Sequence, residues 1–265
     1  MNDKKVVLLI DIGNTNIHFG LCVSNKFINY SQVKICEDLS DILDILLDRM
    51  LRDYDGYETR AYISSVNRNA SGVLLDVLEN RQIRNMSISP FLIFDYCKRT
   101  GLEISNYHFL GSDLFCDIIA AKDEGRSALV LDCGTCFKLL GMDESGKFLG
   151  GSIAPGKSMM LSCLNQGTDL LNVSETFFPN STLMLSTEGA VSSGITFGLG
   201  GMAVKMIEKT VNDFKLKDCK IIVTGGDCQY LAKSMNEFGF DNFTVDSLLT
   251  LKGIALAFKE NINFD

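Results

Sequence analysis

The chain has 265 residues, of which 46% are hydrophobic and 22% charged, so we expect one large or two medium globular domains and no extended disorder. It carries 25 basic and 33 acidic residues, a formal charge of −8, which argues against a protein that binds nucleic acid. No apolar run approaches the ~20 residues that span a membrane, and the N-terminal run VVLLI ends at Asp11, too short for a signal peptide. We therefore expect a soluble, cytoplasmic protein without a membrane or nucleic-acid partner.

The predicted elements alternate between strands and helices. Residues 8–21 contain two apolar runs separated by a glycine-containing turn, which predicts a hairpin of two strands. Apolar side chains spaced for one helical face predict a helix over 38–52, and RAYISS at 60–65 predicts a further strand. The remaining predicted elements are a helix at 114–124, a hairpin at 129–142, a strand at 219–224 and a helix at 228–237. This alternation predicts an α/β architecture.

The two hairpin segments resemble each other. Residues 8–21 read LLIDIGNTNIHFGL and residues 129–142 read LVLDCGTCFKLLGM, and in both an apolar run ends in Asp, with Gly two residues later and a closing Gly. A similarity at nearly half the chain length indicates two similar halves rather than a solenoid, whose repeats are far shorter. We expect two α/β lobes with a cleft between them, divided into residues 1–115 and 116–265.

The turn of the first hairpin is a candidate phosphate-binding site. Gly13 allows close backbone approach, and the N–H groups around Asn14, Thr15 and Asn16 could surround phosphate oxygens. Asp11 ends the strand in a position to hold Mg²⁺, usually through water. An ordinary hairpin turn rich in Asn and Gly is the alternative interpretation.

The second hairpin repeats this turn with Asp132, Gly134 and Thr135, which strengthens the phosphate interpretation. It also contains the one C-x-x-C pair, Cys133 and Cys136, which leaves a redox or zinc protein open. Against that alternative, no second pair lies at ligand spacing, and a free cysteine is more often a small buried hydrophobe. Two histidines, neither near a candidate nucleophile, also disfavour a Ser-His-Asp hydrolase.

Two glycine clusters follow, GGSIAPG at 150–156 and TGGD at 224–227, each of which alone is more often a turn than a site. Together with DIGNTN, GSD at 111–113 and DCGT, however, their order and spacing resemble the type III pantothenate kinases. This family belongs to the superfamily of actin, sugar kinases and heat-shock ATPases. The resemblance extends over essentially the whole chain.

The resemblance implies an ATP-dependent kinase that phosphorylates the terminal hydroxyl of pantothenate, the first step of coenzyme A biosynthesis. It implies two ribonuclease H-like lobes of the actin-like ATPase type with a nucleotide cleft between them, a homodimer, and a requirement for Mg²⁺ and for K⁺ or NH₄⁺. By matching motifs, Asp113 is the general base, Asp11 organises Mg²⁺, and Asp132 is associated with the monovalent cation. The nucleotide-binding residues so implied are Asp11, Gly13, Asn14, Thr15, Asn16, Gly134 and Thr135. Those for pantothenate are Tyr107, Gly111, Ser112, Asp113 and Thr187.

The chain departs from the family pattern on the substrate side. Leu114 stands where the family has Arg, and an isobutyl group cannot bind a carboxylate as a guanidinium does. Lys138 could supply a replacement charge, although its place on a strand favours a solvated side chain. Asp113, with Ser112 beside it, could also be a plain helix cap. A non-catalytic nucleotide-binding or regulatory module, or a kinase for a different small alcohol, therefore stays open.

Overall fold

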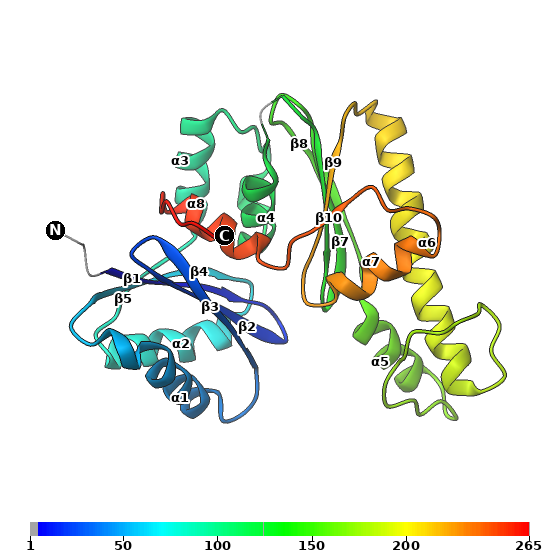
Figure 1. Cartoon of the computed structure of the whole chain (residues 1–265), viewed down its shortest axis with the longest axis horizontal. Coiled ribbons are helices and arrows are strands. Elements are labelled where there is room, and N and C mark those ends of the chain that lie inside the picture. Colours follow the sequence, from blue (N-terminus) through cyan, green and yellow to red (C-terminus); the bar gives the residue numbers. More distant parts are fainter. Residues whose placement is uncertain (1–4, 124, 265) are drawn as a thin grey trace. The chain divides into compact units, whose positions relative to one another are not determined.

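The computed structural model describes residues 5–123 and 125–264, which form two α/β units (Figure 1). The first unit comprises the residues up to Ala120 and those from Leu249 onward, and the second comprises Ala121–Leu248. Each unit contains one five-stranded sheet. The α/β class and the two similar units predicted from the internal similarity are thus confirmed.

The first sheet has the strand order β3-β2-β1-β4-β5. β1, β2 and β3 are antiparallel neighbours, whereas β4 and β5 run parallel to β1. Their bounds are β1 (Lys5–Ile12), β2 (Asn16–Val23), β3 (Lys26–Lys34), β4 (Glu58–Ser65) and β5 (Arg84–Ser87). β1 is central and buried from Val6 to Ile10, as expected for a strand covered on both faces. The predicted hairpin at 8–21 and strand at 60–65 are confirmed.

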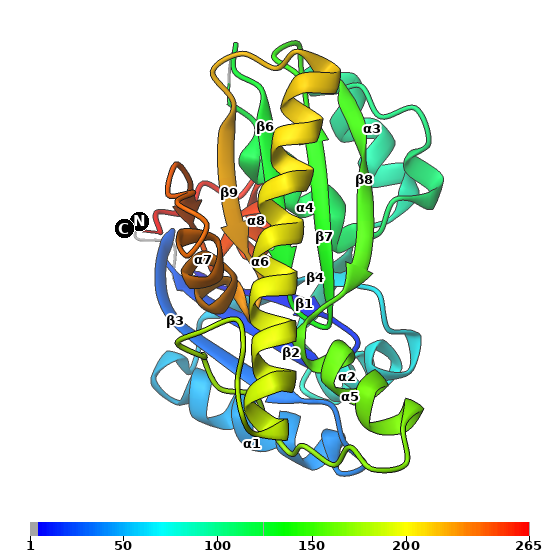
Figure 2. The ribbon, with the colours of Figure 1, turned by 90° about the vertical axis from the view of Figure 1, so that its right-hand side faces the viewer.

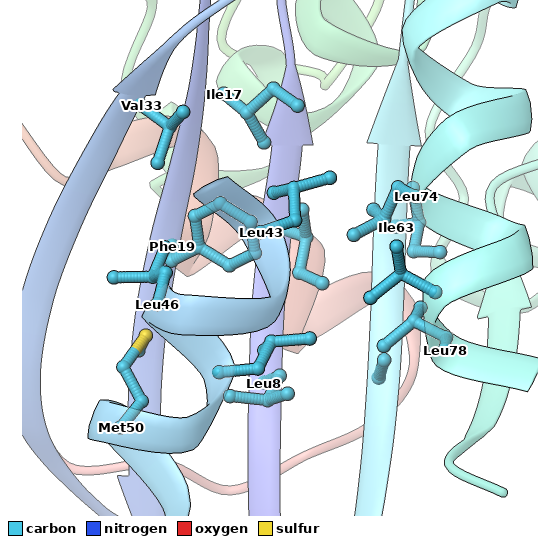
Figure 3. Packing of buried hydrophobic residues seen from close by; sticks show 14 of the residues in the cluster. Leu8, Ile17, Phe19, Val33, Leu43, Leu46, Met50, Ile63, Leu74 and Leu78 are labelled. Carbon is cyan, nitrogen blue, oxygen red and sulfur yellow. The ribbon is translucent and has the colours of Figure 1, made fainter. Parts of the chain in front are cut away.

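Helices lie on both faces of this sheet (Figure 1). Their bounds are α1 (Leu39–Leu51), α2 (Arg68–Asn80), α3 (Pro90–Thr100), α4 (Ser112–Ala121) and α8 (Leu249–Ala257), with short 3₁₀ turns at Arg52–Tyr54 and Tyr107–Phe109. Figure 3 shows α1 and α2 packed on one face, with Leu43 and Leu74 against Phe19, Leu8 and Ile63 of the strands. The predicted helices at 38–52 and 114–124 correspond to α1 and α4.

The end of the chain returns to the first unit. α8 packs on β1 and β4, and the ring of Phe258 stacks on Tyr62 with centroids 4.4 Å apart. Glu260 accepts hydrogen bonds from Lys5 Nζ and Tyr62 Oη, both at 2.7 Å. The predicted division at 115/116 therefore differs from the structure in two respects: the boundary follows Ala120, and the last segment crosses back because the apolar face of α8 is buried on the first sheet.

The second sheet repeats the topology of the first, with the order β10-β9-β6-β7-β8. Here β6, β7 and β8 are antiparallel, and β9 and β10 run parallel to β6 and β9 respectively. The bounds are β6 (Ala128–Cys133), β7 (Cys136–Met142), β8 (Phe148–Pro155), β9 (Lys220–Thr224), β10 (Thr244–Val245), α5 (Lys157–Gly167), α6 (Thr187–Phe214) and α7 (Cys228–Asn236). The hairpin at 129–142, the strand at 219–224 and the helix at 228–237 are confirmed.

The long helix α6 crosses one face of this sheet (Figure 2). Its inner side buries Leu199, Ala203 and Ile207 against the strands and α7. Within the described part of the chain, it is the one helix long and apolar enough to span a bilayer, yet 56% of its most apolar window is buried inside the protein. Packing in the core thus accounts for its apolar character.

The contact between α4 and α8 gives a stability prediction. Gly253 of α8 lies against the backbone of Cys116 in α4, where an added Cβ would overlap the carbonyl group. Gly253→Ala should lower the free energy of unfolding by about 1–3 kcal/mol, as overpacking typically does. Urea denaturation measures this change.

Gly72→Ala is the matched control, because Gly72 lies in the exposed part of α2 with no atom within 4 Å of an added Cβ. It should raise stability by up to about 1 kcal/mol through helix propensity. Equal stability of Gly253→Ala and the wild type would contradict the close α4–α8 packing.

Candidate active site

The first Asp turn lies at the carboxyl end of β1. Asp11 pairs with His18 on β2 and lies beside Ser64 on β4. The turn closes with a 3.0 Å hydrogen bond from Gly13 N–H to the carbonyl of Asn16. Asn14 and Thr15 at its tip are exposed, whereas Oδ1 of Asp11 is buried. The structure thus presents the tip of this turn at the surface, beside a carboxylate at the strand end.

Asp113 lies at the start of α4, in the same unit as Asp11. The carbonyl of Gly111 accepts the N–H of Phe115 at 3.0 Å, so Gly111 takes the cap position, and Ser112 and Asp113 lie in the first helical turn. The cap interpretation of Ser112 or Asp113 therefore differs from the structure by one or two residues. Oδ1 of Asp113 accepts the N–H of Leu114 at 2.8 Å, and the residue stays half-buried and accessible.

Ser112 joins the start of α4 to the end of β4. Its Oγ accepts the N–H of Ser65 at 2.8 Å and donates to the carbonyl of Ser65 at 3.0 Å. The hydroxyl predicted to contact substrate is therefore used within the protein, where it holds Asp113 at the carboxyl end of the first sheet.

Ser64 connects the end of β1 with the start of α4, because it lies beside Asp11 in the β1–β4 pair and its Oγ lies 3.1 Å from Oγ of Ser112, the residue before Asp113. Cys116 is fully buried, and burial raises its pKa well above the usual value. The nearby carboxylates of Asp11, Asp117 and Asp113 raise it further, because each disfavours a second negative charge. The strand pairing and the hydroxyl contact thus place Asp11 and Asp113 at the carboxyl ends of β1 and β4, at the same edge of the first sheet.

The second Asp turn is one residue shorter than the first. The pair Cys133 and Phe137 flanks residues 134–136, whereas Ile12 and Ile17 flank residues 13–16. Gly134 N–H donates to the carbonyl of Cys136 at 3.0 Å. As a result Lys138, and not Leu139, lies opposite Asp132, although the two sequences match without a gap.

Asp132 forms an ion pair with Lys138. The Nζ of Lys138 lies 2.7 Å from Oδ2 of Asp132, and the two side chains are only 19% and 15% exposed. On the other side Gly225, with φ of +90°, approaches so closely that a Cβ would overlap Oδ1 of Asp132. The expectation of a solvated Lys138 thus differs from the structure, since the shorter turn directs its amine to the carboxylate.

The three motifs of the second unit meet around this turn. Gly156 N–H donates to the carbonyl of Thr135 at 3.0 Å, and a Cβ on Gly156 would overlap the carbonyl of Gly134. Lys157, the first residue of α5, forms a 2.9 Å ion pair with Asp227 of TGGD. Sequence reasoning missed Lys157 and treated Asp227 as a turn residue. The sequence Pro-Gly-Lys at 155–157, where a helix begins, could have indicated that Lys157 lies beside the second Asp turn.

Tyr107 and Thr187 lie in different units. The Tyr107 ring, half-buried in a 3₁₀ turn, lies 5.8 Å from the Phe94 ring and 4.1 Å from the His108 ring. Thr187 is the exposed first residue of α6, after the cap Ser186, whose Oγ accepts the N–H of Gly189 at 3.0 Å. Tyr107 thus belongs to the first unit and Thr187 to the second.

The chain is similar to known proteins over most of its length. Residues 7–209 match the profile of the family described as type III pantothenate kinase. That match spans more than half of the chain. The chain belongs to the type III pantothenate kinase family.

A curated relative, the type III pantothenate kinase of Agathobacter rectalis, is 29% identical over 264 residues, covering 96% of this chain and 97% of its own. Among solved structures, a conserved Campylobacter jejuni protein assigned to the Baf family of transcriptional activators is 22% identical, with a TM-score of 0.57, covering 96% of this chain and 98% of that chain. The activator of 2-hydroxyisocaproyl-CoA dehydratase from Clostridium difficile, solved with bound ADPNP, is 13% identical with a TM-score of 0.53, covering 97% of this chain and 95% of that chain. These two structures support the fold alone.

Family membership makes the protein an ATP-dependent pantothenate kinase, an enzyme that transfers a phosphoryl group. For a pantothenate kinase, the donor set at Asp11 suits Mg²⁺, which prefers oxygen ligands and often uses one carboxylate together with substrate phosphates and water. Asp132 does not suit an exchangeable monovalent cation, because the ammonium of Lys138 already lies against its carboxylate.

The cysteines of this kinase give no support to a redox or zinc protein. Cys133 and Cys136 are free, and Cys133 is completely buried. Burial raises the pKa of the Cys133 thiol well above its usual range, and the carboxylates of Asp227 and Asp132 add to the effect. Among the residues that the structure describes, no three His, Cys, Asp or Glu side chains group as metal ligands.

Alkylation tests this assignment. Iodoacetamide at neutral pH should modify the exposed Cys36 and Cys163 of the native kinase and leave Cys133 unmodified, because its thiol is shielded and protonated. Peptide mass spectrometry reads the result, with guanidinium-unfolded protein as the control in which every cysteine reacts. Rapid labelling of native Cys133, or an oxidation product linking it to Cys136, would contradict the assignment.

Proposed function

We propose that this kinase transfers the γ-phosphoryl group of ATP to the terminal hydroxyl of pantothenate, the first step of coenzyme A biosynthesis, in the cytoplasm. The observation that carries the proposal is the family match over residues 7–209, together with an Asp turn at the end of the central strand of each unit. Phosphoryl transfer depends mainly on positioning and on neutralising charge, and these turns offer backbone donors beside carboxylates.

In this proposal the two Asp turns bind the phosphates of ATP. Gly13, Asn14, Thr15 and Asn16 act in the first unit, and Gly134 and Thr135 act in the second. Asp11 would hold Mg²⁺, which would supply positive charge to offset the charge of the phosphates. The exposed tip of the first turn and the half-buried second turn support these assignments.

Asp113 is proposed as the general base that accepts the proton of the pantothenate hydroxyl. A carboxylate that is accessible, anchored through Ser112 and at the same edge of the first sheet as Asp11 can accept that proton while the hydroxyl oxygen bonds to the γ-phosphorus and the bond from this phosphorus to ADP breaks. Tyr107, Gly111 and Thr187 are proposed to contact pantothenate. Ser112 is proposed to position Asp113 rather than to contact pantothenate through its hydroxyl, because that hydroxyl is bonded to the backbone of Ser65.

Asp113→Asn tests the base. The variant should lose at least about a hundredfold in kcat, the usual contribution of general-base catalysis. Its stability should change by less than about 0.5 kcal/mol, because the amide oxygen can still accept the N–H of Leu114. A coupled assay of pantothenate-dependent ADP release, with thermal unfolding alongside, measures both quantities.

Asp95→Asn is the control, since Asp95 is an exposed partner of Arg99 on α3 and should leave turnover unchanged. Full activity of Asp113→Asn with a large loss of stability would assign Asp113 to the helix start alone. Wild-type protein that binds ATP without pantothenate-dependent turnover would favour the non-catalytic module, and turnover with another alcohol would favour a different substrate.

Leu114→Arg tests the departure on the substrate side. Leu114 is half-buried directly after Asp113, so an arginine there could reach the pantothenate carboxylate. We expect the KM for pantothenate to fall about tenfold or more, since a bidentate charged contact is worth about 2–4 kcal/mol. Leu256→Arg, on an exposed face of α8, controls for added charge. An unchanged KM would show that the site binds pantothenate by other contacts.

We also propose a homodimer that buries the apolar side chains exposed between α5 and α6. Leu170, Leu183 and Leu185 are 94%, 88% and 110% exposed, an unusual group for a free surface. The double substitution Leu183→Asp and Leu185→Asp should therefore convert dimer to monomer without unfolding it. Light scattering after size exclusion measures the mass, and a wild-type monomer at micromolar concentration would contradict the proposal.

A further inference from the structure

The second unit contains its own fixed cations at the turn proposed to bind phosphate. Lys138 and Asp132 face each other across β7 and β6, with 2.7 Å between Nζ and Oδ2. Next to Asp132 in sequence, the carbonyl of Cys133 accepts the N–H of Asp227, and the carboxylate of Asp227 lies 2.9 Å from Nζ of Lys157. Both carboxylates of this region are thus paired with lysine, so an anionic triphosphate can approach them with less repulsion.

The carboxylate that would coordinate an added cation already carries one. Oδ2 of Asp132 lies 2.7 Å from the ammonium of Lys138, and on the other side Gly225 approaches Oδ1 so closely that even a Cβ would overlap it. The nearby carbonyl of Cys133 accepts the N–H of Asp227 at 2.8 Å. A second cation placed here would also repel the ammonium at close range, in a partly buried environment where charges are weakly screened.

The length of the turn produces this pairing. With residues 134–136 between the paired ends, the alternation of β7 puts Lys138 opposite Asp132 and buries Phe137 and Leu139 on the other face. If the same sequence were paired in the register of the first unit, residues 134–137 would form the turn and Leu139 would lie opposite Asp132. The lysine and the short turn therefore act together.

We propose that the Lys138 ammonium serves as a built-in replacement for the exchangeable monovalent cation, so that nucleotide binding and phosphoryl transfer in this enzyme need neither K⁺ nor NH₄⁺. The proposal rests on the kinase function proposed above and concerns how its phosphate site is neutralised. Lys138 acts as a positioning residue, because it holds the Asp132 carboxylate and offsets its charge.

The first test compares salts on the wild-type enzyme. ATP affinity, measured by calorimetry, and kcat/KM for ATP are determined in KCl, NH₄Cl and choline chloride at equal ionic strength, since screening changes with ionic strength alone. We expect the same values in all three salts. Stimulation of about tenfold or more by K⁺ or NH₄⁺ over choline would overturn the proposal.

The second test removes the built-in cation. Lys138→Met keeps the length of the side chain and removes its charge, and in choline chloride it should weaken ATP binding about tenfold or more, as loss of one member of a hydrogen-bonded charge pair does. NH₄⁺ or K⁺ should then restore binding, and Lys138→Arg should need neither ion. Lys147→Met, an exposed lysine of the next turn, is the control and should behave as wild type in every salt. Failure of both ions to restore ATP binding to Lys138→Met would contradict the proposal, because a cation position that the lysine has left should accept either ion.

A third readout needs neither ATP nor catalysis. The thermal midpoint of the ligand-free protein should be the same in KCl and choline chloride for the wild type, whereas Lys138→Met should gain a K⁺-specific increase, because only the variant has a vacated carboxylate to bind the ion. This result separates the two proposals. If the wild type binds no ATP, the kinase function fails, yet the K⁺-dependent midpoints still show whether Lys138 occupies the cation position. A K⁺-specific increase in the wild type would overturn that assignment.

Discussion

The structure depends on one arrangement that occurs in both units: a buried central strand with a partly exposed aspartate near its carboxyl end. In β6 every residue except Asp132 is buried, and in β1 the stretch from Val6 to Ile10 is buried just before Asp11. A slip of one residue in either strand would turn apolar side chains to the wrong face of the sheet, so the core fixes where each carboxylate emerges. Hydrophobic packing of the two strands thereby sets the positions of the two carboxylates that we propose to act in phosphoryl transfer.

The two units use this arrangement differently. In the first unit, Asp11 and Asp113 lie at the carboxyl ends of β1 and β4, and the hydroxyl of Ser112 joins the helix that carries Asp113 to the end of β4. In the second unit, Asp132 and Asp227 are each paired with a lysine. In the proposed function, the first unit would provide carboxylates for a divalent metal and a proton, and the second would provide a neutralised surface for phosphate. The one-residue difference in turn length decides which side chain lies opposite the aspartate, His18 in the first unit and Lys138 in the second.

Local patterns in the sequence predicted much of this fold, because the hairpins, α1, β9 and α7 each follow from the spacing of their own apolar residues. The return of α8 to the first unit could not be predicted in the same way, since it depends on burial against strands that lie far away in sequence. The partner of Lys138 was missed for a related reason. Aligning the two Asp turns without a gap hides the shorter second turn, and only the strand register reveals which side chain faces Asp132.

Mass spectrometry of the reaction product tests the central claim most directly. Purified protein is incubated with ATP, Mg²⁺ and pantothenate in choline chloride, and the molecular mass of the pantothenate species is then measured. The account predicts that pantothenate gains one phosphoryl group, in equal amount to the ADP formed, without added K⁺ or NH₄⁺. Pantothenate of unchanged mass in every salt, with folded protein that still binds ATP, would contradict it.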